Sequence, residues 1–156
     1  MPEPAFPRNL PDERELLLEW LGYLREAVLR KVTGITDDQG HWTPQERLIP
    51  LLGIVNHLTH VEWRWIDGAM LGHAVHRSDA EFSPGPDLTV ARAVAAYRER
   101  AAKTDAIVRA HPLDQGSISG ESVTLRWVLL HLINETARHA GHADAVRELL
   151  DGVIGE

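Results

Sequence analysis

Apolar side chains recur at three- and four-residue steps along four long stretches of the chain, which is the period of a helix with one buried face. The pattern predicts helices over about 12–33, 50–71, 88–110 and 122–150. No stretch alternates with the two-residue period of a strand, so the expected fold class is all-α. Helices of about 20 to 29 residues span about 30 to 43 Å, a length typical of a four-helix bundle.

Residues that favour helix ends flank these stretches: Pro11 and Gly34, Pro50 and Gly72, Asp87 and Pro112, Ser122 and Gly152. Asp87 and Ser122 are the expected N-caps of the third and fourth helices. Thr43, Pro44 and Glu46 match a capping box and predict a short helical turn before the second helix. Residues 73–86 end in Ser83-Pro84-Gly85-Pro86 and predict a long crossing loop. The whole chain, 1–156, is expected to form one domain.

Composition narrows the functions open to this chain. The formal net charge is −7 without a basic run, which argues against nucleic acid as a partner. No stretch reaches the roughly 20 apolar residues that span a bilayer, and no signal-peptide pattern precedes the first helix, so a cytoplasmic protein is expected. Cysteine is absent, which excludes disulfides and thiolate metal sites. Any sulfur chemistry would therefore need an external thiol, whereas nine histidines offer imidazole chemistry.

The last helix places polar groups on a stripe that is otherwise apolar. This stripe comprises Val128, Leu132, Glu135, His139, His142, Val146 and Leu149. Glu135 and His139 are four residues apart and lie one turn from each other on one face, so their donor atoms can meet at one ion. His57 on the second helix, flanked by apolar residues, is the candidate third ligand. Two imidazoles and a carboxylate with open positions fit catalytic zinc, although nickel, iron or manganese would also suit them.

The same residues admit other interpretations. Glu135 and His139 could be a buried hydrogen-bonded pair, and His57 a core histidine whose polar atoms are satisfied. His142 could be a fourth ligand, a proton carrier or a pocket wall, and His60 is angled somewhat away from His57. His131, one turn before Glu135, is a candidate for supporting the ligands. Two charged residues on the second helix, Glu62 and Arg64, are expected to be solvated.

Two segments resemble the DinB-like superfamily, which includes the YfiT-like metal hydrolases and the mycothiol-dependent maleylpyruvate isomerases. They are Gly53-Ile-Val-Asn-His-Leu-Thr-His-Val-Glu62 and Trp127-Val-Leu-Leu-His-Leu-Ile-Asn-Glu-Thr-Ala-Arg-His-Ala-Gly-His-Ala-Asp144. The chain is most similar to an actinobacterial branch related to the metal-binding domain of the isomerases. The resemblance implies that His57, Glu135 and His139 hold zinc or nickel. Many members have histidine at the position of Glu135. The isomerase branch instead resembles this chain, with glutamate at that position.

The resemblance also implies a crossed up-down-down-up bundle, with the long crossover loop between helices two and three, and a homodimer. The activity it implies is a thiol-dependent S-transferase or isomerase that uses a mycothiol-type thiol on small molecules. A bound metal would lower the pKa of the thiol, and His142 or His60 is expected to move the proton. A metal-dependent hydrolase of a small amide or ester is the second hypothesis. A non-enzymatic metal- or ligand-binding stress protein is the third.

Overall fold

The computed structural model describes residues 5–155, and its regular secondary structure is helical. In chain order the elements are α1 (Glu13–Arg30), α2 (Asp37–His41), the 3-10 turn η1 (Pro44–Glu46), α3 (Leu51–Trp63), the π-helix η2 (Arg64–Met70), the 3-10 turn η3 (Asp79–Phe82), α4 (Val90–Ala110) and α5 (Leu125–Asp151). Residues 5–155 contain no strand, only an isolated bridge between Gly116 and Thr124. The predicted all-α class is confirmed.

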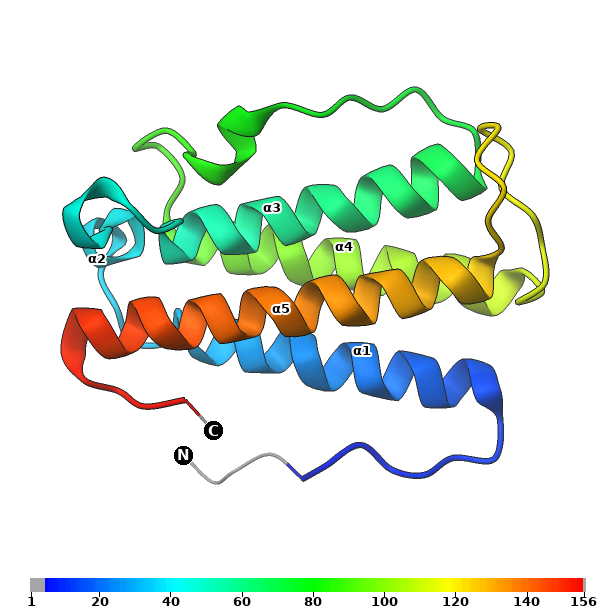
Figure 1. Ribbon diagram of the computed structural model, residues 1–156, viewed down its shortest axis with the longest axis horizontal. Coiled ribbons are helices and arrows are strands. Elements are labelled where there is room, and N and C mark those ends of the chain that lie inside the picture. Colours follow the sequence, from blue (N-terminus) through cyan, green and yellow to red (C-terminus); the bar gives the residue numbers. More distant parts are fainter. Residues whose placement is uncertain (1–4, 156) are drawn as a thin grey trace.

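The four long helices lie side by side (Figure 1). α1 packs against α5, α5 against α3, α3 against α4, and α4 against α1. The connection from α3 to α4 returns along the length of the molecule, so these two helices run in the same direction (Figure 1). None of the helices in the described part of the chain has the length and apolar character needed to cross a membrane.

Some helix ends lie where the sequence predicted them, and others differ by a few residues. Asp12 caps α1 through a 2.9 Å bond from the Glu15 amide, and Gly152 ends α5 in the left-handed region at φ 79°. α4 is capped by Thr89 rather than Asp87, and α5 by Thr124 rather than Ser122. In both cases the hydroxyl of a threonine closer to the helix accepts the hydrogen bond from a backbone N–H that was expected to go to the predicted cap.

The capping box lies earlier than predicted. Thr36 and Gln39 exchange both bonds of the box at the start of α2, whereas Thr43 makes no side-chain capping bond. The turn that follows Thr43 contains Gln45 and Glu46 with positive φ, a conformation that a regular helix start does not have. The sequence pattern thus indicated a turn in the right place but the wrong hydrogen bonds.

Two apolar clusters fill the interior, one toward each end of the helices. One cluster includes Val28 of α1 and Val146 of α5, and the other includes Leu21 of α1 and Leu132 of α5. Where the two clusters meet, every long helix carries buried polar side chains: Arg25, His57, Glu62, Arg100, Thr104, Thr136 and His139. We call these residues the polar layer. Buried polar groups are stable only when they are hydrogen-bonded, paired or bound to a metal. The polar layer is therefore the part of the interior that can hold a functional site.

Candidate metal centre

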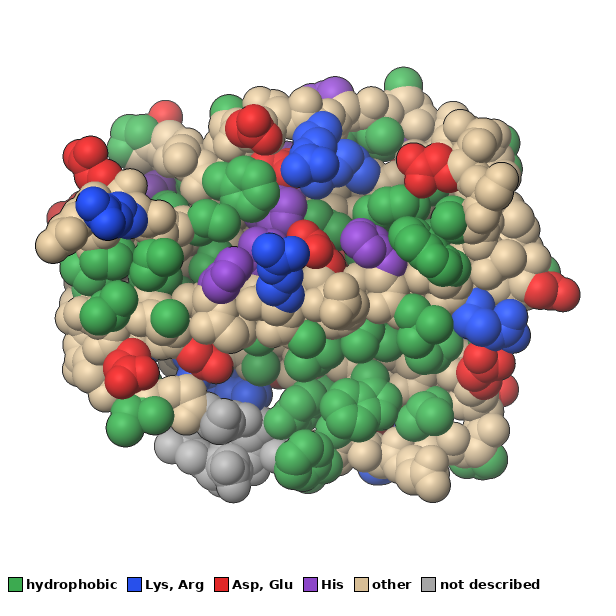
Figure 2. All heavy atoms as spheres, viewed as in Figure 1, with side chains coloured by type: hydrophobic (Ala, Val, Ile, Leu, Met, Phe, Trp, Pro, Cys, Tyr) green, Lys and Arg blue, Asp and Glu red, His purple; other side chains and the backbone are tan. Residues whose placement is uncertain are grey.

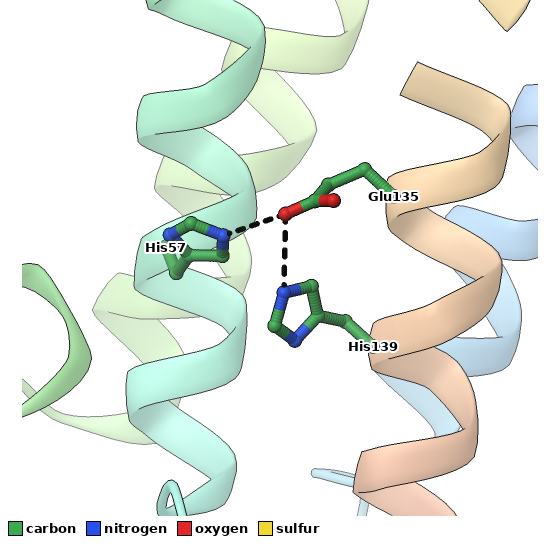
Figure 3. Close-up of side chains that lie close together, drawn as sticks. All are labelled: His57, Glu135 and His139. Atoms are coloured by element: carbon green, nitrogen blue, oxygen red, sulfur yellow. Dashed lines mark hydrogen bonds and ion pairs between the residues drawn. The ribbon is translucent and has the colours of Figure 1, made fainter. Parts of the chain in front are cut away.

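Two helices bring His57, Glu135 and His139 together in the polar layer. His57 lies on α3, whose residues between Leu51 and Leu58 are nearly all buried, so its side chain is held within the interior. Glu135 and His139 are one turn apart on α5, which packs beside α3. One ligand atom of each residue lies within 4.8 Å of the others, and the side chains converge on the space between the two helices (Figure 3).

A single carboxylate oxygen of Glu135 faces both imidazoles. Its Oε1 lies 3.1 Å from Nε2 of His57 and 3.3 Å from Nε2 of His139. His57 is 3% exposed and His139 is 6% exposed, whereas the side chain of Glu135 is 22% exposed. The two imidazoles are thus buried, and the group reaches solvent through the side chain of Glu135.

Burial and neighbouring charges set the protonation of these groups. Burial raises the pKa of Glu135, but the hydrogen bond with His57 and the charge of His139 outweigh it and hold that pKa below its ordinary value. For His139, burial and then the neighbouring His57 lower the pKa, and Glu135 opposes them only in part. Near neutral pH the arrangement is therefore an ionised carboxylate beside a neutral His139 ring.

The hydrogen bonds of His57 test whether a cation fits between the ligands. Its Nδ1 lies 2.8 Å from Oε1 of Glu81, an acidic group on the crossing connection. An ionised carboxylate only accepts hydrogen bonds, so Nδ1 carries a hydrogen, and in the neutral form of the ring the lone pair is on Nε2 and faces Glu135. Two acceptors 3.1 Å apart repel unless a proton or a metal ion lies between them.

His139 supplies the third candidate ligand atom, Nε2. Its Nδ1 is buried and has no hydrogen-bond partner among the described residues. This nitrogen is unmatched whether Nε2 donates to Glu135 or binds a metal ion, so the fit to a cation rests on the donor set. Two imidazole nitrogens and a carboxylate oxygen are the donor set of open zinc sites and also suit nickel, so the residues present fit a divalent cation.

Two of the three residues, His57 and Glu135, border a cleft of about 680 Å³. Its floor includes His57 and Glu135, and its walls come from the end of α3, from η2, from α5 and from the loops that follow η2 and α4: Val61, Arg64, Trp65, Gly68, Ala69, His73, Val75, Arg77, Ser119, Glu121 and His131. Histidine and acidic side chains gather near the centre of this face, with cationic side chains beside them (Figure 2). The cleft is large enough for a small organic molecule next to the candidate ligands.

The other predicted site residues lie apart from this floor. His142 is exposed on α5 and contacts His139 ring to ring, with centroids 5.3 Å apart, but it does not line the cleft. His60 faces α4 in a separate pocket with Trp63 and His76, and its Nδ1 lies 2.8 Å from the Asn56 carbonyl oxygen. The structure does not bring His60 and the three candidate ligands together.

Sequence reasoning missed two participants in the cleft or beneath it, Arg64 and Glu81. Arg64, expected to be solvated, lines the cleft and makes a two-bond pair with Glu81, which was not singled out at all. Glu81 is 24 residues from His57 and lies in a loop without periodicity, so no sequence pattern indicated the contact. His131 does line the cleft, and its ring stacks on Trp127 and packs against Trp65.

The fold and this group define an all-helical protein with a candidate metal centre at the floor of a cleft. The sequence model of the mycothiol S-transferase family matches residues 16–152. The chain therefore belongs to the mycothiol S-transferase family, a DinB-like family, as the resemblance had implied. Comparison with curated proteins gives no match.

Proposed function

We propose that the protein is a divalent-metal-dependent S-transferase that joins a mycothiol-type thiol to a small electrophile. The observation that carries the proposal is the convergence of His57, Glu135 and His139, two of which, His57 and Glu135, border an open cleft, in a chain that has no cysteine of its own. Family membership supports the identity of the thiol. An alternative hydrolase would use the same ligands, but no feature of the cleft favours it.

The residues have distinct roles in this proposal. His57, Glu135 and His139 would hold zinc, or nickel as the alternative, and leave coordination positions open toward the cleft. A divalent cation held there would lower the pKa of a bound thiol, so that thiolate forms near neutral pH. In the transfer, the S–H bond gives up its proton to a base, a carbon–sulfur bond forms, and the bond from carbon to the leaving group breaks.

The proton needs an acceptor near the cleft. Of the two histidines proposed from the sequence, His142 contacts His139 and lies on the same helix as Glu135, whereas His60 belongs to another pocket. His131 lines the cleft and lies one turn from Glu135. We propose His131 as the first acceptor to test and keep His142 as the second, because a base must come within hydrogen-bonding reach of the proton or of one linking water.

The proposal includes the finer features that the resemblance implied. The directions of the four long helices (Figure 1) support an up-down-down-up four-helix bundle with the connection after α3 as the crossover. We also propose a homodimer and a cytoplasmic location, a compartment in which small thiols stay reduced. Gel filtration with light scattering tests the dimer independently of activity.

The test of activity uses zinc-loaded protein, mycothiol and an alkyl bromide that becomes fluorescent when its bromide is replaced by sulfur. We expect conjugation to exceed the uncatalysed rate, and we expect Glu135→Ala and removal of the metal by a chelator to abolish the gain. Conjugation at the uncatalysed rate for the zinc- and nickel-loaded protein alike would overturn the proposal. Hydrolysis of esters or amides without added thiol would favour the alternative.

A further inference from the structure

The short turn η3 (Asp79–Phe82) in the connection between α3 and α4 is docked against α3 beside His57. The side-chain amide of Asn56 donates a 2.8 Å hydrogen bond to the main-chain oxygen of Glu81. At Gly53 a Cβ atom would lie 2.1 Å from the main-chain oxygen of Phe82, so a side chain there would displace the turn. The Phe82 ring stacks on His57 with centroids 4.2 Å apart. The turn is therefore held in one position relative to this imidazole.

The docked turn carries a buried carboxylate. Glu81 is 6% exposed, although it follows several exposed residues of the loop. Arg64 donates to Oε2 at 2.7 Å and to Oε1 at 2.9 Å, and Oε1 also lies 2.8 Å from Nδ1 of His57. A buried carboxylate is tolerated when it is paired in this two-bond geometry. Arg64 thus lets Glu81 remain charged next to the imidazole.

This arrangement has a consequence for the far side of the ring. When Nδ1–H is committed to Glu81, the lone pair of His57 is on Nε2, which faces the space shared with Glu135 and His139. We infer that Glu81 is a positioning residue of the metal centre, which fixes the tautomer and orientation of His57 so that Nε2 is available to a divalent cation. The inference rests on the proposed function only in requiring that a metal binds, since it involves no thiol.

If the Arg64–Glu81 pair had a purely structural role, its loss would have different effects on stability and on metal binding. The pair would then attach the crossing connection to α3, and its loss would lower stability without a specific effect on metal binding. A positioning carboxylate acts on the ligand itself, and loss of such partners weakens metal binding by about 10- to 100-fold. Metal affinity and the tautomer of His57 therefore distinguish the two roles.

The first experiment measures Co²⁺ affinity by competition with a chelating dye for the wild type, Glu81→Gln and Glu121→Gln. Glu121 is a matched control because its exposed carboxylate borders the same cleft and its replacement removes the same charge. We expect Glu81→Gln to raise the Kd by about 10- to 100-fold and Glu121→Gln to bind like the wild type. Equal affinities for the wild type and Glu81→Gln, or equal losses in both variants, would overturn the inference.

The second experiment needs no variant, so it holds even where Glu81→Gln fails to fold. Nitrogen-15 NMR of the metal-free wild type is expected to show hydrogen on Nδ1 of His57, and a ring with hydrogen on Nε2 alone would overturn the inference. Failure of the transferase proposal is distinguishable: a protein without thiol activity whose Co²⁺ affinity still depends on Glu81 supports the inference. A wild type that binds no Co²⁺ overturns it.

Discussion

Glu62 of α3 accepts two hydrogen bonds from Arg25 of α1, both 2.8 Å long, across the polar layer of the interior. Arg25 also donates a 2.8 Å bond to Asp105 of α4, so one guanidinium joins three of the four long helices. The side chains of Arg25 and Glu62 are 5% and 2% exposed. Burial lowers the pKa of Arg25, but the charge of Glu62 and its hydrogen bond outweigh burial and keep the guanidinium charged.

Removal of the Glu62 carboxylate is expected to leave this charge partly uncompensated in the interior. Glu62→Ala should lower the free energy of unfolding by roughly 3–5 kcal/mol, the cost of breaking a buried pair, as measured by urea denaturation. The control is Glu26→Ala, which breaks the exposed Arg98–Glu26 pair and should cost about 0–1 kcal/mol. Similar losses in the two variants would mean that the buried pair contributes no more than a surface pair.

Metal binding should raise thermal stability, because the ligands come from two helices that separate on unfolding. Zinc at about 100 times its Kd adds about 2.7 kcal/mol, which for a chain of this size is a rise in Tm of roughly 5–10 °C. Differential scanning calorimetry with and without zinc measures the shift. His139→Ala should show no comparable rise, and a zinc-dependent rise of the same size in that variant would place the bound ion elsewhere.

The proposed proton acceptor can be identified by comparing variants of three histidines in the same conjugation reaction. His131→Gln is expected to lower kcat by about 10²- to 10⁴-fold if it acts as the general base, with metal content unchanged. His60→Gln serves as the control, since His60 lies in the separate pocket against α4. A large loss for His142→Gln with none for His131→Gln would transfer the role to His142, and no loss in either would exclude both.

Acidification should destabilise the protein in part through two carboxylates of α1. Arg126 of α5 lies 2.6 Å from Glu13, and Arg109 of α4 lies 2.9 Å from Glu15. These hydrogen bonds lower the pKa of each carboxyl by more than burial raises it. The stabilisation is therefore present above the unfolded carboxyl pKa of about 4.3 and is lost as pH falls through the lower folded value.

The measurement is Tm as a function of pH for the wild type and for the double variant Glu13→Gln/Glu15→Gln. The double variant should lose less Tm than the wild type between roughly pH 5 and pH 3, because it has no such carboxylates to protonate. Glu99→Gln serves for comparison: its exposed partner Lys103 lies on the same helix and also lowers the pKa of Glu99, so this variant measures the part of the pH dependence that arises within one helix. Parallel curves for the double variant and the wild type would refute this explanation.

The sequence predicted the helices and the candidate ligands because both depend on local spacing. The three- and four-residue period located all four long helices, and the four-residue interval placed Glu135 and His139 together on α5. His57 was singled out for its apolar neighbours, and the structure does place it opposite this pair. Helix periodicity, however, gives the face of a residue and not its partner on another element.

The errors arose where the partner is distant in the chain. Glu62 and Arg64 were expected to be solvated, and this was wrong because their partners Arg25 and Glu81 come from other elements. The predicted core-facing stripe of α5 also included two residues that are exposed: Leu149, which is 59% exposed, and His142. A helical wheel does not show where the neighbouring helices end their contact with α5.

The metal content of untagged protein tests the central claim most directly. Inductively coupled plasma mass spectrometry is applied to the wild type, Glu135→Ala and His139→Ala, with folding of each variant checked by circular dichroism. One zinc or nickel ion per chain in the wild type, lost in both folded variants, is the result we predict. A wild type that holds no metal even after zinc and nickel are offered would contradict the account and would make His57, Glu135 and His139 a buried polar group alone.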